Sequence, residues 1–210
     1  MDIITLRPNW IYLASRSPRR QQLLSQIGVN FEVLSLREAS PRIADVDETP
    51  LPDEIPLDYA RRIALVKAEM GRLRLVQRGF PDRPVLAADT AVVLGKRILG
   101  KPADPAHAKE MLETLSGQTH HVLTAVAVAA QTGVQVRTST TMVEFRNITE
   151  REIRAYLAYS EAQDKAGAYA IQGRAAVFIS AISGSYSGVV GLPLFETAQL
   201  LEEYGIRLFT

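Results

Sequence analysis

The sequence predicts an α/β fold with a mixed, twisted sheet and flanking helices. Glycine-containing turns between apolar runs indicate hairpins, and amphipathic helices between other apolar runs indicate crossovers, so antiparallel and parallel strand pairs are both expected. The composition, 47% hydrophobic and 22% charged over 210 residues, is that of an ordinary globular protein. This length predicts a single domain over residues 1–210.

Five elements are expected in the first part of the chain. A short buried strand over 10–14 precedes a helix over 17–28, which has a serine at its N-cap, a proline at its first position and a glycine at its end. A strand follows over 31–36. The proline-rich, acidic stretch 37–56 predicts a loop, and helical periodicity then predicts a helix over 58–78. Its apolar stripe comprises Tyr59, Ile63, Val66, Met70 and Leu73.

Turn and cap residues divide the middle of the chain. A two-residue turn of Gly-Lys joins a strand over 85–94 to a short strand over 97–99. Asp104 is the expected N-cap of a helix that ends before Gly117. Two long strands, over 121–130 and 134–145, flank a short polar turn.

Three elements complete the predicted fold. Thr149 and Glu152 form the pattern of a capping box, which predicts a helix through Tyr159. The apolar run over 175–182 predicts a strand, followed by a Gly-Ser loop. A last helix is expected over 193–204, where a glycine stops it.

Composition also excludes several classes of function. The net charge of +1 leaves no excess of basic residues for bulk nucleic-acid binding. Without cysteine the chain has no disulfide or thiolate zinc site, and its three histidines lack zinc-site spacing. No apolar run approaches the ~18 residues of a membrane span, and Asp2, Arg7 and Pro8 interrupt any secretory segment. We therefore expect a cytoplasmic protein without a membrane or nucleic-acid partner.

The segment LASRSPRRQQLL occupies the first strand–helix junction. Arg19 and Arg20 fall in the first turn of the helix, where each cation opposes the helix dipole by about 0.3–1 kcal/mol. A phosphate chain would remove this penalty, because it could accept hydrogen bonds from helix N–H groups, from Ser15 and Ser17, and from both guanidinium groups. The alternative is that the arginines are solvated or pair with nearby acids.

A carboxylate, Asp89, interrupts the apolar strand VLAADTAVVL. Buried aspartates are rare unless they are paired or bind a metal. Asp89 could hold magnesium beside a polyphosphate, or accept a proton from attacking water despite an ordinary pKa of ~3.9. The alternatives are a turn cap and an ion pair with Lys101. The following GKRILGKP is not a P-loop, because Pro102 replaces the required Ser or Thr, so Lys101 is a phosphate contact or a solvated lysine.

Two further charged residues also have two interpretations. Lys67 lies on a helical stripe with Ala60, Ala64 and Gly71, and these small neighbours indicate close packing beside the core. A solvated boundary lysine is the plainer alternative. Glu48 lies in the long predicted loop, where acidic residues are usually only part of the surface.

Eight segments, in order, resemble the Maf family of nucleoside triphosphate pyrophosphatases. They are LASRSPRRQQLL, VDET, RIALVKAE, AADTAVVL, LGKP, LSGQTHHVLTAVAV, DKAGAYAIQG and GSYSGVVGLPLFET. The resemblance implies that water splits a nucleoside triphosphate into its monophosphate and pyrophosphate with a divalent cation, usually magnesium and alternatively manganese. It also implies two lobes around a cleft, similar to inosine triphosphate pyrophosphatases, and a homodimer.

The resemblance also implies roles for single residues. Asp89 matches the family's proton acceptor, and Glu48 matches an acidic loop position that would bind metal together with Asp89. The matched substrate-binding positions are Ser15, Arg20, Lys67 and Lys101. Gly100 departs from the pattern, because many relatives carry an acid there, and this weakens the metal assignment.

Three positions divide the family by nucleotide. The subgroup that acts on dTTP and UTP carries Arg, Thr and Gln, as this chain does at Arg19, Thr90 and Gln172. The amide of Gln172 offers a donor and an acceptor to the carbonyl and N–H of thymine or uracil, although Gln172 could be only a turn residue. One methyl group discriminates weakly, so both bases, and modified pyrimidines, are expected substrates. The alternatives are a 7-methylguanosine triphosphate pyrophosphatase and a nucleotide-binding regulator of septum formation.

Overall fold

The computed structural model of the chain describes residues 10–37 and 44–209. Its strands are β1 (Trp10–Leu13), β2 (Asn30–Val33), β3 (Val85–Leu94), β4 (Arg97–Leu99), β5 (Thr119–Ala130), β6 (Gly133–Phe145) and β7 (Ile179–Ser183). Its α-helices are α1 (Pro18–Gln26), α2 (Pro56–Gln77), α3 (Pro105–Leu115), α4 (Glu150–Leu157), α5 (Tyr186–Val190) and α6 (Leu194–Glu203). The 3₁₀ helices are η1 (Ala166–Ala168) and η2 (Arg174–Phe178).

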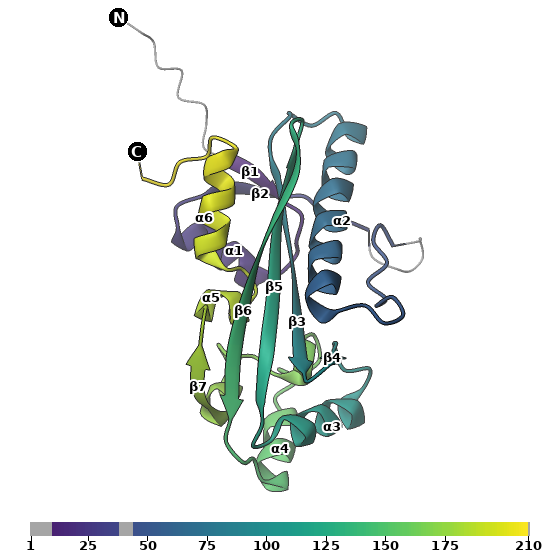
Figure 1. The fold of residues 1–210 in the computed structure, drawn as a ribbon, viewed down its shortest axis with the longest axis vertical. Helices are drawn as coiled ribbons and strands as arrows, with labels where there is room; N and C mark the ends of the chain where they lie inside the picture. The colour runs from purple at the N-terminus through teal and green to yellow at the C-terminus, as the bar shows by residue number, and fades with distance from the viewer. Residues whose placement is uncertain (1–9, 38–43, 210) are drawn as a thin grey trace, which may run out of the picture.

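The strands form one seven-stranded mixed sheet, as predicted, in the order β2-β1-β3-β5-β6-β7 with β4 paired to β3 (Figure 1). β1 pairs in parallel with β2 and β3, whereas the other neighbours are antiparallel. The parallel pairs follow from the helical crossovers through α1 and α2, and hairpins join β3 to β4 and β5 to β6. Among the described residues, no helix combines the length and hydropathy that crossing a bilayer requires.

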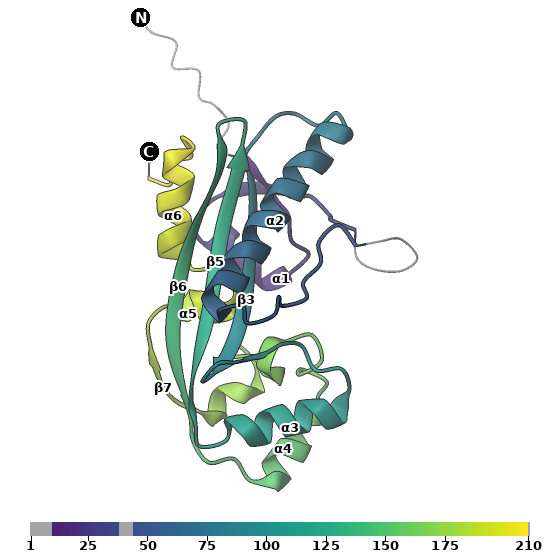
Figure 2. The same cartoon turned by 45° about the vertical axis from the view of Figure 1, so that its right-hand side comes forward.

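Helices cover both faces of the sheet (Figures 1 and 2). Alternate residues of each strand enter two different cores, because side chains in a strand point to opposite faces. One core packs under α2 and contains Tyr12, Ala87 and Ala125. The other packs under α1 and α6 and contains Leu13, Ala88 and Val126.

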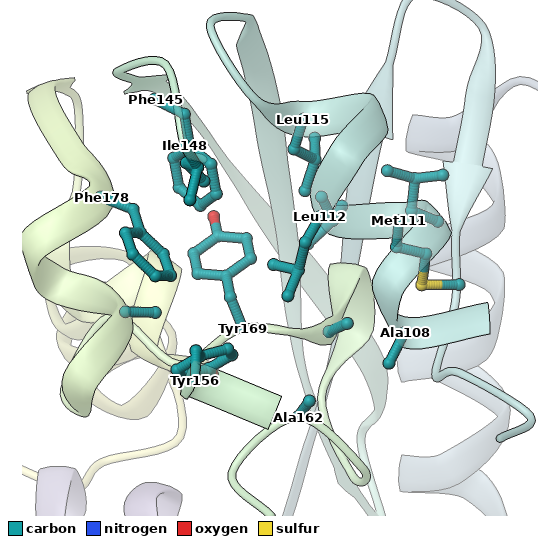
Figure 3. Packing of buried hydrophobic residues seen from close by; sticks show 14 of the residues in the cluster. Ala108, Met111, Leu112, Leu115, Phe145, Ile148, Tyr156, Ala162, Tyr169 and Phe178 are labelled. Carbon is teal, nitrogen blue, oxygen red and sulfur yellow. The ribbon is translucent and has the colours of Figure 1, made fainter. Parts of the chain in front are cut away.

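A third core forms a second lobe at one end of the long strands (Figure 1). Figure 3 shows side chains of α3, α4 and η2 packed around Phe145 and Tyr169. Strands β3, β5 and β6 pass through both lobes, so the lobes share one hydrogen-bonded sheet. The two expected lobes are therefore present, while the cleft between them stays a prediction.

Most of the predicted elements are confirmed. The ranges of β3 and β4 match the prediction residue for residue, and α3 begins at its predicted cap, where Asp104 accepts a hydrogen bond from the His107 N–H. The capping box of Thr149 and Glu152 is present in α4, which ends two residues earlier than predicted. Part of the predicted loop, 38–43, lies outside the described residues, as do Asp2, Arg7 and Pro8, and the described part, 44–55, contains no helix or strand.

Three predictions about elements are wrong in part. The strand expected over 31–36 is the shorter β2, and the loop expected before α6 contains the five-residue helix α5. The strand expected over 175–182 begins with η2 instead. Ala175 and Phe178 are buried while Val177 is exposed, so burial follows the three-residue period of a 3₁₀ helix. A short apolar run does not distinguish these alternatives by itself.

The predicted apolar stripe of α2 is wrong in part, because Ile63 is buried as expected but Leu73 is exposed. The buried face comprises Ala60, Ile63, Ala64, Ala68, Gly71 and Leu75. A Cβ atom on Gly71 would lie 2.7 Å from Cγ1 of Val85, so the helix touches the sheet where only small residues fit. The close packing inferred around Lys67 is confirmed.

Candidate active site

The candidate site forms where β1 ends and α1 begins. β1 pairs with only the start of β3, up to Leu13 opposite Leu86, and β3 continues beyond it. The chain leaves β1 through α1 on one face of the sheet and reaches β3 through α2 on the other. The carboxyl ends of β1 and β3 thus flank a topological switch point, where open α/β sheets bind ligands.

Asp89 and Thr90 lie on this continuation of β3, with their side chains on opposite faces of the sheet. Ala87 belongs to the core under α2 and Ala88 to the core under α1 and α6. Strand alternation therefore directs Asp89 toward α2 and Thr90 toward α1. One peptide unit thus links a carboxylate on one face with a hydroxyl on the other.

Lys67 joins both predicted carboxylates. Its Nζ lies 2.7 Å from Oδ1 of Asp89 and 2.8 Å from Oε1 of Glu48. Asp89 is only 6% exposed, the Lys67 side chain is 15% exposed and that of Glu48 is about half exposed. Lys67 is therefore not a solvated boundary lysine, and the partner of Asp89 is Lys67 rather than Lys101.

The surroundings move the two carboxylate pKa values in opposite directions. Burial raises the pKa of Asp89 and outweighs the attraction of Lys67 and Arg20. Burial opposes ionisation of Glu48 too, but Lys67, Lys101 and Arg20 together hold its pKa below the ordinary value. Asp89 is consequently a stronger base than an exposed aspartate, and Glu48 stays an anion.

Arg20 is held by three neutral acceptors. Its Nε donates to the Gly191 carbonyl at 2.8 Å, Nη1 to Oγ of Ser15 at 3.3 Å and Nη2 to Oγ1 of Thr90 at 3.4 Å. Burial lowers its pKa, opposed by Asp89, yet a guanidinium stays charged at neutral pH. No carboxylate within the described residues forms a salt bridge with Arg20, so a fixed charge is available for an anion.

The start of α1 has the same preference for an anion. Ser17 occupies the N-cap, as predicted, but its side chain makes no capping hydrogen bond. Its N–H instead donates to Oγ of Ser15 at 3.2 Å. The first turn of α1 contains no acidic residue, so the helix dipole is not offset there. This arrangement supports the phosphate interpretation of LASRSPRRQQLL.

Lys165 is a basic residue of the site that the sequence analysis missed. It is half-buried near Arg19 and Lys101, and burial together with these two cations lowers its pKa. The Gly167 N–H donates to the carbonyl of Gly100 at 3.1 Å, which fixes the loop of Lys165 beside Lys101. Gly167 has φ +70°, which suits glycine, and the position of Lys165 two residues before it in the segment DKAGAYAIQG was the available signal.

Gln172 stands apart from the other predicted residues. It is exposed in a turn after Ile171, and no hydrogen bond joins it to another described residue. Ile171 packs in the same core as Leu23 of α1, so the turn lies on the α1 side of the sheet. The structure thus fits the turn interpretation of Gln172 and does not test base recognition.

The carboxylates suit a magnesium ion that also binds substrate. Oxygens of Asp89 and Glu48 converge on a single cationic group, the ammonium of Lys67. The described residues contain no cluster of three or more metal-ligating side chains. Magnesium is commonly held by one or two carboxylates plus substrate phosphates, so this small donor set fits the ion.

Comparisons with known proteins agree with the resemblance. The model of the family described as Maf-like protein matches residues 10–204. A protein of Nitrosospira multiformis, named dTTP/UTP pyrophosphatase, is 70% identical over 206 residues, covering 98% of this chain and 100% of the relative. Proteins with the same name from Nitrosomonas europaea and Aromatoleum aromaticum are 63% and 55% identical, covering 99% and 94% of this chain and 100% and 97% of the relatives. This chain belongs to the Maf family.

Proposed function

We propose that this protein hydrolyses dTTP and UTP to their monophosphates and pyrophosphate. The observation that carries the proposal is the placement of a buried, basic Asp89 beside Lys67, next to the unneutralised Arg20. The names of relatives up to 70% identical support the substrates. A triphosphate and a water molecule are the reactants that such a carboxylate and such cations would bring together.

The phosphate chain binds at the start of α1. Ser15 and the free N–H groups of the first helical turn donate hydrogen bonds to one phosphate, and Arg20 donates to another. Further positive charge around the phosphate chain comes from Lys67, Lys101 and Lys165. These groups are in place before the substrate binds, so they stabilise developing negative charge with little reorganisation.

Asp89 accepts the proton of the attacking water. Its Oδ1 is held by Lys67, and no described residue hydrogen-bonds to Oδ2, which can accept from water. The water oxygen bonds to the α-phosphorus, the bond from that phosphorus to the bridging oxygen breaks, and pyrophosphate leaves in line. The proton passes to Asp89, whose raised pKa favours this transfer.

We propose magnesium as the cofactor, with manganese as the alternative, held by Asp89 and Glu48. When bound, the cation supplies charge that neutralises the phosphates. We assign selectivity for the nucleobase to Arg19, Thr90 and Gln172. The difference of one methyl group is worth only ~1–3 kcal/mol, so dTTP and UTP are both substrates, and modified pyrimidine triphosphates are candidates.

The proposal is tested with purified protein, magnesium and a panel of nucleoside triphosphates. Pyrophosphate release from dTTP and UTP should exceed that from 7-methylguanosine triphosphate. Asp89→Asn should lower release by a factor on the order of 10²–10⁴, because the general base is lost, while nucleotide binding persists. Asp82→Asn, which alters an exposed ion pair with Arg72, is the matched control and should be fully active.

Two results would favour the alternatives. Binding without turnover by the unmodified protein would favour a nucleotide-binding regulator of septum formation. Preferential hydrolysis of 7-methylguanosine triphosphate would favour the other subgroup. Full activity of Asp89→Asn would remove Asp89 from the mechanism.

We also propose a cytoplasmic homodimer. The family resemblance supports the dimer, and the absence of cysteine suits a reducing compartment. The low net charge of +1 gives no reason to add a nucleic acid as partner. Sedimentation equilibrium tests the dimer, and a mass of one chain at micromolar concentration would contradict it.

A further inference from the structure

Buried hydroxyl side chains gather on the sheet where α5 packs against it. The buried polar and charged residues within the described ranges are Asp89, His120, Thr124, Ser139, Thr141 and Thr197. Thr124 on β5 lies directly opposite Ser139 on β6, and Thr141 follows on the same face of β6. Oγ1 of Thr124 donates to the carbonyl of Gly188, in α5, at 2.8 Å. Because burying a hydroxyl is unfavourable unless it is hydrogen-bonded, the partners of this group indicate its role.

Thr141 holds the residue before α5 through both of its backbone groups. Its Oγ1 accepts from the Ser185 N–H at 2.9 Å and donates to the Ser185 carbonyl at 3.2 Å. Thr141 is 1% exposed, and a Cβ atom on Gly184 would lie 2.8 Å from the same Oγ1. The chain therefore passes Thr141 where only a glycine fits, and the hydroxyl fixes the start of α5 on β6.

This attachment reaches the active site through one short helix. Oγ of Ser185 accepts from the Gly188 N–H at 3.0 Å, and the Gly188 carbonyl accepts from the Gly191 N–H at 3.0 Å. Gly191, whose φ is +127°, directs its own carbonyl to Nε of Arg20 at 2.8 Å. Of the three neutral acceptors that hold Arg20, this carbonyl is the nearest. A series of hydrogen bonds thus leads from Thr141 to Arg20.

The carbonyl of Gly191 sets how the guanidinium of Arg20 faces a ligand. A guanidinium has five N–H groups in one plane, and Arg20 donates with three of them to the described residues Gly191, Ser15 and Thr90. The remaining two, on the Nη atoms, can bind a phosphate only if the plane matches its oxygens. A bond on Nε fixes that plane, and small misplacements of such a group lower a rate by large factors.

We propose that Thr141 is a positioning residue for the hydrolysis: by fixing α5 on the sheet, it holds the Gly191 carbonyl that orients Arg20 toward the phosphate chain. This inference rests on the proposed function, in which Arg20 binds a phosphate. It goes further, because it assigns a role to a buried residue that acts only through Arg20. Packing alone does not require a hydroxyl here, since a valine would fill the same space.

The test is a double-mutant cycle in which kcat/KM for dTTP is measured. Thr141→Val keeps the shape of the side chain but removes both hydrogen bonds to Ser185, so kcat/KM should fall about tenfold. Thr141→Ser keeps the hydroxyl and should stay within threefold of the unmodified protein. Arg20→Lys keeps a positive charge but loses the Nε donor to Gly191. In that background, Thr141→Val should lower kcat/KM by less than a further twofold.

Thr197→Val is the matched control, because Thr197 is fully buried in α6 and its hydroxyl has no hydrogen-bond partner among the described residues. It should leave kcat/KM unchanged in both backgrounds. If circular dichroism shows that Thr141→Val does not fold, Ser185→Ala replaces it in the cycle. This change removes the cap of α5 and should lower kcat/KM about fivefold, but less than twofold in Arg20→Lys.

Two results overturn this inference alone, with dTTP still hydrolysed by the unmodified protein. One is activity of Thr141→Val within twofold of the unmodified protein. The other is an equal loss in both backgrounds, because general destabilisation does not depend on the residue at position 20. Failure of the unmodified protein to hydrolyse dTTP and UTP overturns the proposed function and this inference with it.

Discussion

At the scale of single residues, two carboxylates that share one lysine differ in their chemistry. Lys67 contacts Asp89 and Glu48 at nearly equal distances, 2.7 and 2.8 Å, so distance does not separate them. Burial separates the two carboxylates, because Asp89 lies in the sheet interior and Glu48 lies at the surface. The buried member is suited to accept a proton, and the exposed member is suited to remain charged.

Replacing Lys67 tests this arrangement. Lys67→Met preserves the length of the side chain but removes the charge that faces the carboxylates and the phosphates. We expect kcat/KM for dTTP to fall about 100-fold or more, a loss typical of removing one preorganised charge. Steady-state kinetics measure the loss, with circular dichroism to verify folding.

Lys96→Met is the control for the loss of a lysine charge, because Lys96 is exposed in the turn between β3 and β4. It should retain full activity. Activity of Lys67→Met within twofold of the unmodified protein would show that Lys67 only packs beside Asp89.

At the scale of elements, helix α2 is positioned by its smallest residues. Ala60, Ala64 and Gly71 allow the helix to approach the sheet closely, and this approach carries Lys67 to Asp89 on β3. A face of larger residues would hold the helix farther away. The composition of the helix face therefore sets a catalytic distance.

Gly71→Ala measures how tight this contact is. Alanine favours a helix by about 1 kcal/mol over glycine, but its Cβ would lie 2.7 Å from Val85 and 3.1 Å from Ala14. Because overpacking typically costs about 1–3 kcal/mol, we expect net destabilisation of about 1 kcal/mol in urea unfolding, with reduced activity. Glu69→Ala, on the exposed side of the same helix, should be neutral, and a Gly71→Ala variant more stable than the unmodified protein would disprove the close contact.

At the scale of the whole molecule, the second lobe contains a histidine that stays neutral. His120 is fully buried, its Nε2 lies 2.8 Å from Oη of Tyr169, and its ring meets Phe145 edge-on. No described residue hydrogen-bonds to Nδ1. Burial, with a smaller contribution from His121, lowers the pKa of His120 to about 4. Figure 3 shows the apolar side chains packed around Tyr169.

This histidine should make the stability of the protein depend on pH. The unfolded chain binds a proton at His120 below pH ~6.5, while the folded chain resists it until about pH 4, so the free energy of unfolding falls as the pH drops between these values. The slope approaches about 1.4 kcal/mol per pH unit. Urea unfolding from pH 7 to 5 should show the fall, reduced in His120→Gln and retained in His121→Gln, and equal slopes in all three proteins would contradict it.

Across the whole molecule, the elements that the sequence predicted well are those with local signals. Turn glycines, prolines and caps placed β3, β4 and α3 almost to the residue, because these signals act through local backbone geometry. The segment 174–178 and the buried face of α2 were mispredicted, because both depend on what packs against them. A local apolar pattern indicates which residues are suited to burial, but it does not specify which segment of the chain will pack against them.

For the site, the residue types and their order were sufficient to nominate Ser15, Arg20, Lys67 and Asp89. The sequence by itself determined which chemical groups this protein has and which short segments present them, since propensity, capping and turn geometry are local. Only the tertiary structure decided which groups meet: that Lys67 faces Asp89, that Thr90 points to the other side of the sheet, and that Lys165 joins the cations. The reason is that burial and proximity come from packing between segments far apart in the chain, and these determine pKa values, hydrogen-bond direction and available charge.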